Sequence, residues 1–173
     1  MKNNPPVILL RKLRPEDEVY LASIGNNREI WNNLRNRFPH PYTVADARFF
    51  IEMVQNEDPQ QTFAIEKEGR LAGIAALLIQ RDVYSGSAEI GYWLGKDFWG
   101  QGIATEVVQR LMRYGFGILG LTRIYACVFE YNQASMRILE KNGFRKEGIA
   151  RKAVLKNGEL WDEYRYAKLS TDV

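Results

Sequence analysis

Two glycines separated by one glutamine, Gly100-Gln101-Gly102, stand directly before the strongest amphipathic pattern in the chain. Glycine lets a backbone come close to a ligand, and the free N–H groups at the start of a helix attract phosphate. The segment therefore predicts a phosphate-binding loop, although a plain turn before a helix has the same composition. The apolar residues behind it fall on one helical face: Ile103, Ala104, Val107, Val108, Leu111, Met112 and Phe116.

Two familiar phosphate loops do not fit this segment. A P-loop needs Gly-Lys-Ser/Thr, and no lysine follows Gly102. A dinucleotide-binding fingerprint needs glycine or alanine at the position of Thr105, together with an all-parallel strand context. Hairpin signals such as Asn157-Gly158 indicate antiparallel strands instead. The loop is therefore expected to belong to another class of phosphate site.

The single cysteine and the single histidine limit the chemistry that the chain can perform. No disulfide can form within it, which favours a reducing, cytoplasmic setting, and no transition-metal cluster is expected. Nothing near Cys127 in the sequence would activate its thiol for covalent acyl transfer. His40 lies between two prolines in a predicted loop, where it is either exposed to solvent or part of a ligand pocket.

Hydrophobic periodicity predicts the elements that must position these residues. Strands are predicted at residues 7–13, 62–66, 71–80, 88–94 and 121–129, with a final hairpin around Asn157-Gly158. Helices are predicted at residues 15–26, 29–37, 44–54, 103–116 and 134–141. Gly91 interrupts a regular strand, where glycine often marks a bulge or a close ligand. The order predicts a mixed α/β domain, mostly antiparallel, with one parallel strand pair where the long helix crosses over.

Length and composition indicate one globular domain, placed at residues 8–169. The chain has 173 residues, of which 46% are hydrophobic and 26% charged with both signs mixed. A net charge of +3 suits an anionic ligand, but there is no basic stripe of the kind that nucleic acid requires. No apolar stretch is long enough to cross a bilayer. Neither nucleic acid nor a membrane is therefore expected as a partner.

The loop and several segments around it resemble the GNAT N-acetyltransferases. Their phosphate loop reads Gln/Arg-x-x-Gly-x-Gly/Ala, which this chain matches at Gly102 and Ala104, whereas Trp99 departs from it at the first position. That departure, together with residues 89–94 (Glu-Ile-Gly-Tyr-Trp-Leu), resembles the subgroup that acetylates the N-termini of ribosomal proteins. Two later segments, Asn132-Gln133-Ala134-Ser135 and Glu140-Lys141-Asn142-Gly143-Phe144, resemble motifs of the same subgroup. The resemblance runs from about residue 9 to residue 169.

This resemblance implies a GNAT-like mixed sheet, mostly antiparallel, splayed at its middle strands and flanked by helices. The pantetheine arm of acetyl-CoA, the expected cosubstrate, would enter the splay, and no metal would be required. Asn132 would contact the pantetheine, cap the following helix, or do both. The residues implied in cofactor binding are Tyr92, Trp93, Leu94, Gln101, Gly102, Ile103, Ala104, Thr105, Asn132 and Ser135.

Attack of an amine on a thioester requires a neutral amine and a proton for the leaving thiolate. Glu89 is the candidate base, because strand alternation places it on the same face as Gly91 and Trp93; a surface glutamate is the alternative. Ser135 is the candidate acid, with Tyr131 as the other possible donor. An α-amine is already about a tenth neutral at pH 7, so a water-mediated base suffices for it, whereas a lysine or polyamine needs a stronger one.

The expected reaction is direct acetyl transfer to a primary amine, either a protein N-terminus or a small molecule such as a polyamine, an amino acid or an aminoglycoside. The alternative is a non-catalytic acyl-CoA-binding regulatory domain. A homodimer is expected by resemblance only. Residues 31–50 are expected to select the acceptor. Six aromatic residues are predicted to pack in the core or in the final hairpin, or else to line the acceptor site: Trp31, Phe38, Phe49, Trp161, Tyr164 and Tyr166.

Overall fold

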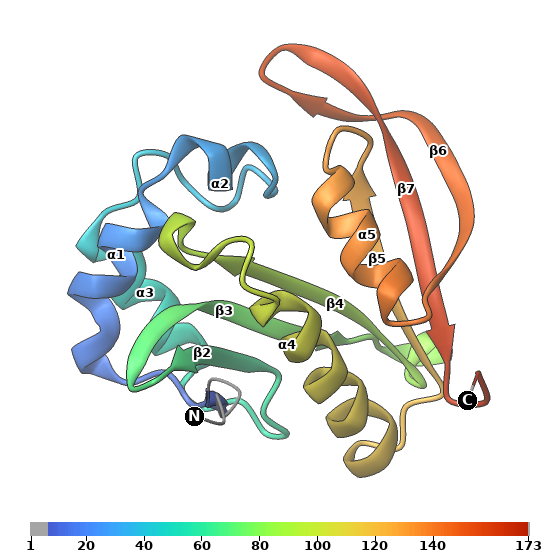
Figure 1. The fold of residues 1–173 in the computed structure, drawn as a ribbon, viewed down its shortest axis with the longest axis horizontal. Coiled ribbons are helices and arrows are strands. Elements are labelled where there is room, and N and C mark those ends of the chain that lie inside the picture. Colours follow the sequence, from blue (N-terminus) through green and yellow to red (C-terminus); the bar gives the residue numbers. More distant parts are fainter. Residues whose placement is uncertain (1–6, 173) are drawn as a thin grey trace, which may run out of the picture.

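The computed structural model describes residues 7–172 and contains one seven-stranded sheet in the order β1-β2-β3-β4-β5-β7-β6 (Figure 1). Neighbouring strands are antiparallel except for β4 and β5, which are parallel. The strands are β1 (Ile8–Arg11), β2 (Thr62–Lys67), β3 (Arg70–Ile79), β4 (Ser87–Leu94), β5 (Arg123–Phe129), β6 (Arg145–Lys156) and β7 (Glu159–Leu169). The predicted mixed sheet with its single parallel pair is confirmed.

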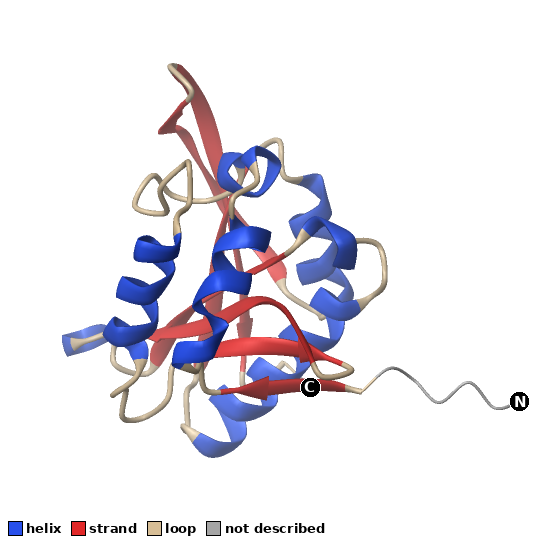
Figure 2. Cartoon of the chain, turned by 90° about the vertical axis from the view of Figure 1, so that its left-hand side faces the viewer, coloured by secondary structure: helices blue, strands red, loops and turns tan. Residues whose placement is uncertain are grey.

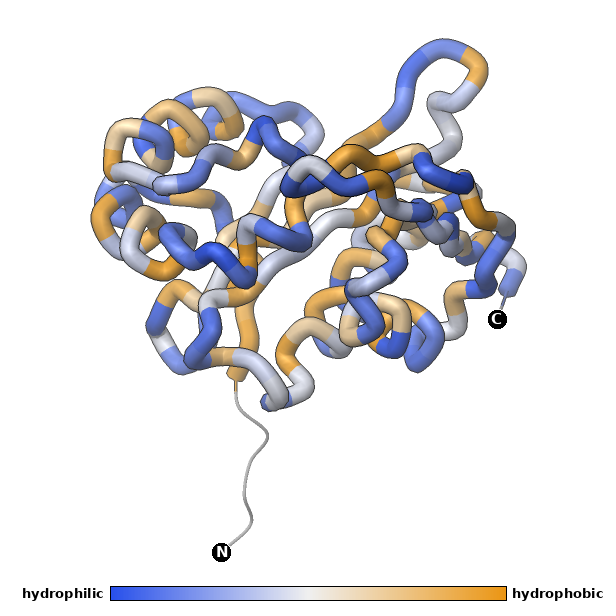
Figure 3. Tube along the Cα trace, turned by 90° about the horizontal axis from the view of Figure 1, so that it is seen from above, coloured by the Kyte–Doolittle hydropathy of each residue, from blue (hydrophilic) through white to orange (hydrophobic). Residues whose placement is uncertain are grey.

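Helices cover both faces of this sheet (Figure 2). They are α1 (Glu18–Gly25), α2 (Arg28–Asn32), α3 (Val44–Val54), α4 (Ile103–Met112) and α5 (Gln133–Lys141). The core between α4, α5 and the sheet includes Val107, Leu111 and Leu139, whereas α1 and α3 bury Leu21 and Ile51 against the other face. In Figure 3, apolar stretches run through the central strands. Among residues 7–172, no helix combines the length and the apolar character that crossing a bilayer requires.

Two sequence predictions about the first helices are wrong. The helix predicted over residues 29–37 ends at Asn32, and an irregular loop follows. The segment is polar, so it has no apolar stripe whose burial would stabilise further turns. The core placement given as one alternative for Phe49 is also wrong: Phe49 is 69% exposed, because α3 buries the stripe formed by Ala47, Ile51 and Val54 instead. A place at the acceptor site, the other alternative, stays a prediction.

The middle of the sheet opens between β4 and β5. These strands pair only from Ser87↔Arg123 to Glu89↔Tyr125. Beyond this point β4 stays paired with β3 as far as Leu94, while β5 stays paired with β7 as far as Phe129. The two strands therefore diverge, as Figure 1 shows, and the edge of β4 after Glu89 has no strand beside it.

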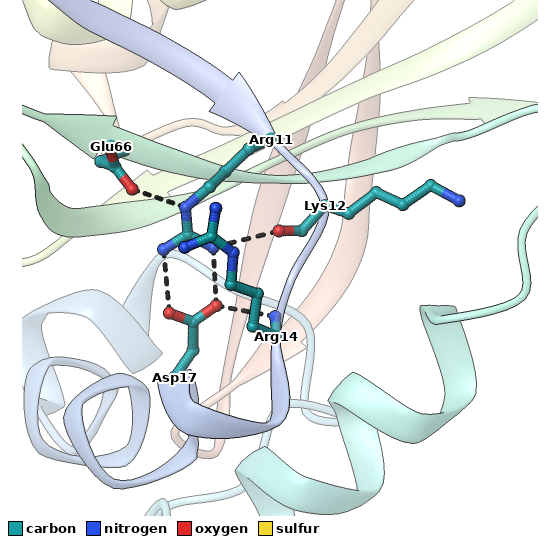
Figure 4. Close-up of polar contacts among 5 residues, drawn as sticks. All are labelled: Arg11, Lys12, Arg14, Asp17 and Glu66. Carbon is teal, nitrogen blue, oxygen red and sulfur yellow. Dashed lines mark hydrogen bonds and ion pairs between the residues drawn. The ribbon is translucent and has the colours of Figure 1, made fainter.

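An ionic cluster attaches the first strand to its neighbours (Figure 4). Arg11 on β1 donates to both carboxylate oxygens of Asp17, at 2.8 and 2.9 Å, and to Glu66 on β2 at 2.6 Å. Burial raises the pKa of Asp17, but hydrogen bonds from the Arg11 side chain and the Arg14 backbone outweigh it and hold that pKa below its usual value. The cluster fixes the start of α1 against the sheet.

Candidate active site

The predicted phosphate loop ends in a helix start that lacks a side-chain cap. Gly102 is the N-cap residue of α4 and has a left-handed backbone with φ of 76°, and Gly100 has φ of 71°. Such angles strain any residue with a side chain, which explains the two glycines. By contrast, Thr43 caps α3 and Asn132 caps α5 through their side chains. The start of α4 therefore keeps its positive dipole end open.

The backbone N–H groups of residues 101–105 donate no hydrogen bond to any of residues 7–172. The first backbone bond of α4 runs from the N–H of Glu106 to the carbonyl of Gly102, at 3.2 Å. Lys67 on β2 adds a positive charge beside the loop, since its Nζ lies 2.5 Å from Oε1 of Gln101. Free donors, a helix start and a lysine together form a site suited to phosphate.

Trp99, which departs from the GNAT loop pattern, connects this loop to β4. Its indole N–H donates to the carbonyl of Leu94, at 2.8 Å. The bond holds the start of the loop against the last residue of the strand. Because α4 follows the loop directly, the open helix start and the unpaired edge of β4 are kept next to each other.

Gly91 lies on that unpaired edge, and a methyl group added at its Cα would meet no atom within 4 Å. The pairing of β3 with β4 runs past Gly91 without a register shift, so no bulge is present there. The bulge that the sequence allowed at Gly91 is therefore absent, and close approach of a ligand stays a prediction.

Ser135 lies beside the tyrosine of the same strand. Its Oγ is 2.9 Å from the hydroxyl oxygen of Tyr92, and its backbone N–H donates to Oδ1 of Asn132 at 3.1 Å. Burial raises the pKa of Tyr92 to about 12, although the bond with Ser135 lowers it in part. Tyr92 is therefore protonated at neutral pH and can donate to Ser135. Asn132 caps α5, which satisfies one of its two expected functions.

Glu89 is on the opposite face of β4 from Tyr92, as strand alternation predicts. Its side chain is 17% exposed and forms an ion pair with Arg35, which belongs to the loop after α2. The two predicted catalytic side chains, Glu89 and Ser135, therefore approach the opening between β4 and β5 from different faces of the sheet. The pattern of residues around Glu89 contained no sign of Arg35, which is 54 positions away.

A buried lysine holds the loop that carries Arg35. Lys156 at the end of β6 is 2% exposed, and its Nζ donates to the carbonyl of Leu34 at 2.9 Å and to Oδ1 of Asn36 at 2.8 Å. The same Nζ lies 3.4 Å from the ring centre of Trp31, and burial lowers the pKa of this lysine. Sequence reasoning missed Lys156, because an exposed position is the rule for lysine near a hairpin turn.

Tyr131, which follows β5, holds the end of α2 in place. Its hydroxyl donates to the carbonyl of Asn32 at 2.5 Å, and its ring packs edge-on against Trp161 with centroids 4.9 Å apart. The hydroxyl proton is therefore used to hold the end of α2. Trp161 packs in this cluster, whereas Tyr166 is buried under α5 and donates to Glu140 at 2.9 Å.

The remaining candidates contribute aromatic packing or an inert thiol. Phe38 stacks on Tyr42 with centroids 4.4 Å apart and meets the edge of Trp93 at 5.6 Å. His40 is exposed, and its ring centre lies 5.7 Å from that of Trp31. Burial raises the pKa of Cys127 to about 11, helped by Glu163 and Glu89, so its thiol is protonated at neutral pH. Within residues 7–172, no three His, Cys, Asp or Glu side chains are grouped to hold a metal ion.

Comparison with known proteins shows the family to which the chain belongs. Residues 8–145 match the acetyltransferase (GNAT) domain. The chain is 33% identical to the uncharacterized N-acetyltransferase p20 of Bacillus licheniformis, over 95% of this chain and 94% of that protein. It is 42% identical to the probable N-acetyltransferase YjcK of Bacillus subtilis, over 91% of both chains. The putative ribosomal N-acetyltransferase YdaF of Bacillus subtilis is 36% identical over 61% of this chain and 57% of that protein.

Solved structures share the whole architecture. An acetyltransferase of the GNAT family from Bacillus anthracis superposes with a TM-score of 0.82 at 27% identity, covering 94% of this chain and 95% of that one. Spermidine N-acetyltransferase from Vibrio cholerae, in complex with CoA and spermine, superposes with a TM-score of 0.82 at 25% identity, covering 95% and 96%. The overall fold is thus shared with these structures, and the chain belongs to the GNAT family as an acetyl-CoA-dependent N-acetyltransferase.

Proposed function

We propose that the chain transfers the acetyl group of acetyl-CoA to a primary amine by direct attack within a ternary complex. The observation that carries this proposal is the uncapped start of α4, whose N–H groups from Gln101 to Thr105 are free beside the unpaired edge of β4. The pyrophosphate would bind these N–H groups, with Ile103 and Ala104 in the first turn. The CoA bound to the related Vibrio cholerae enzyme supports acetyl-CoA as the acetyl donor of this chain.

The rest of the acetyl-CoA molecule would lie along the opening between β4 and β5. Backbone groups of Tyr92 and Leu94 face this open edge, and those that the Trp99 indole leaves free can bond the amides of pantetheine. The carbonyl of Trp93 faces β3 beside Gly73 instead, so Trp93 would contribute through its side chain. The side-chain amide of Asn132 keeps its Nδ2 free of bonds to residues 7–172, so it can donate to the same arm. This arrangement would place the thioester near Ser135.

The reaction then needs two proton movements. The amine nitrogen attacks the thioester carbon, a C–N bond forms and the C–S bond breaks. The CoA thiolate takes its proton from Ser135, which Tyr92 can resupply through the 2.9 Å contact. The amine proton passes to Glu89, directly or through water, once Arg35 gives up its pairing with that carboxylate. Cys127 takes no part, because its pKa of about 11 keeps the thiol protonated.

The test of this function is thiol release from acetyl-CoA in the presence of an amine panel. The panel contains peptides with free N-termini, spermidine, free amino acids and an aminoglycoside. We expect acetylation of at least one amine, seen as a mass increase of the acceptor that matches the released thiol. If acetyl-CoA binds but no amine of the panel is acetylated, the chain would instead be a non-catalytic acyl-CoA-binding regulator. Cytoplasmic location and a homodimer stay predictions.

The choice between Ser135 and Tyr131 as the acid can be tested by substitution. We expect Ser135→Ala to lower kcat by about 100-fold, the usual effect of losing a general acid, with the affinity for acetyl-CoA retained. Tyr131→Phe should keep most of kcat, because its hydroxyl already donates to Asn32. Single-turnover kinetics of the two variants make the comparison, and a larger loss in Tyr131→Phe would reverse the assignment.

A further inference from the structure

A hollow lies on the sheet face that carries Glu89. It encloses about 310 Å³ over the start of β4 and β5 and over the neighbouring part of β7. Six residues line it: Gln80, Tyr84, Ser87, Arg123, Tyr125 and Arg165. The hollow contains no acidic side chain and two arginines, so its own charge is positive.

The two arginines differ in how far their charge is compensated. Arg123 forms a double hydrogen bond with Glu147, at 2.6 and 2.5 Å, which neutralises it. Arg165 forms no ion pair with any carboxylate of residues 7–172, and its guanidinium donates a hydrogen bond only to the thiol of Cys127, at 3.9 Å. Glu163 and Glu147 act on its charge from beyond ion-pair distance and compensate it only in part. Both guanidinium carbons lie 5.7 Å from the ring centre of Tyr125. The aromatic ring holds the Arg165 charge in place without cancelling it.

The register of the sheet places this charge close to the proposed base. Glu89 pairs with Tyr125 across the parallel strands, and Arg165 pairs with Cys127 on the next strand. Strands are about 4.8 Å apart and rise about 3.3 Å per residue, so Arg165 lies on the order of 10 Å from Glu89. An extended peptide spans about the same length in three residues.

We propose that this hollow binds a carboxylate of the acceptor, and that the acceptor is therefore a peptide with an acidic residue at its second or third position. The inference rests on the proposed acetyl transfer to an amine. With the α-amine at Glu89, an acidic side chain would reach Arg165, whose planar guanidinium suits a carboxylate. A polyamine would place a second positive charge against Arg165, which opposes its binding.

The test uses matched acceptors and matched variants. Two peptides that begin Ser-Ala-Asp and Ser-Ala-Asn, otherwise identical, are compared with spermidine in the thiol-release assay. In the unaltered protein we expect a KM for the Asp peptide about tenfold below that for the Asn peptide, the size of one charge-assisted hydrogen bond. Arg165→Gln should remove this difference by raising the KM of the Asp peptide alone, with an unchanged KM for acetyl-CoA. Arg145→Gln, the same charge change at an exposed site on β6, should preserve it.

Three outcomes would overturn the inference. The first is an equal KM for the two peptides, and the second is an equal effect of Arg165→Gln on both. The third is spermidine being a better acceptor than the Asp peptide. Each of these results leaves amine acetylation intact, whereas the absence of thiol release with every amine would remove the proposed function itself.

Discussion

Gly102→Val is expected to abolish measurable binding of acetyl-CoA, a loss of at least 100-fold in affinity. The valine side chain would stand at the open start of α4, where the phosphates must approach the N–H groups. It would also strain a backbone whose φ is 76°, at a cost of about 1–2 kcal/mol. Isothermal titration with acetyl-CoA measures the effect directly.

The control separates this effect from backbone strain alone. Gly120 also has a positive φ, of 66°, is exposed, and leaves open space around an added side chain, but it lies beyond the other end of α4. Gly120→Val should therefore lose a similar amount of stability and retain acetyl-CoA affinity. Near-normal binding by a folded Gly102→Val variant would remove the loop from the donor site.

Glu89→Gln is expected to lower kcat/KM for the amine by about 100-fold near pH 7, as loss of a general base does. The deficit should shrink as the pH rises past the ordinary pKa of the acceptor amine, about 8 for an α-amine and about 10.4 for a lysine-type amine. Above that pH the amine is already neutral and needs no base to begin its attack. Affinity for acetyl-CoA should be unchanged.

A pH–rate profile of the variant beside the unaltered protein checks this expectation. Glu159→Gln is the matched control, since Glu159 is exposed at the start of β7 and forms no ion pair within residues 7–172. If the pH–rate profile of Glu89→Gln has the same shape as that of the unaltered protein, the proton transfer belongs to water and not to Glu89. The pH at which the deficit disappears also reports which kind of amine is the acceptor.

Much of the donor side could be predicted from short stretches of sequence. The glycines of the loop, the apolar face of α4 and the alternation along β4 are local patterns, and each depends on backbone preferences within a few residues. The role of the loop in binding phosphate stays a prediction. The indole bond from Trp99 to Leu94 was not foreseen: it joins residues only five positions apart, but no propensity describes it.

The acceptor side was predicted less well, because it is built from distant contacts. The helix predicted for residues 29–37 ends at Asn32, which Tyr131 holds through its hydroxyl. The loop that follows is held by Lys156, which is more than 100 positions away in the sequence. Phe49 shows the same limit within one helix. Helical spacing by itself does not say which face of α3 is buried, and the packing of α3 against α1 and the sheet decides it.

The sequence by itself determined the element order, the glycine loop before α4, the cap of α5 and the faces of β4, since these follow from dihedral preferences and periodicity. Only the tertiary structure decided where β4 and β5 part, that Tyr92 meets Ser135, and that Arg35 pairs with Glu89. Such contacts depend on register and packing across the whole sheet, which no local pattern encodes.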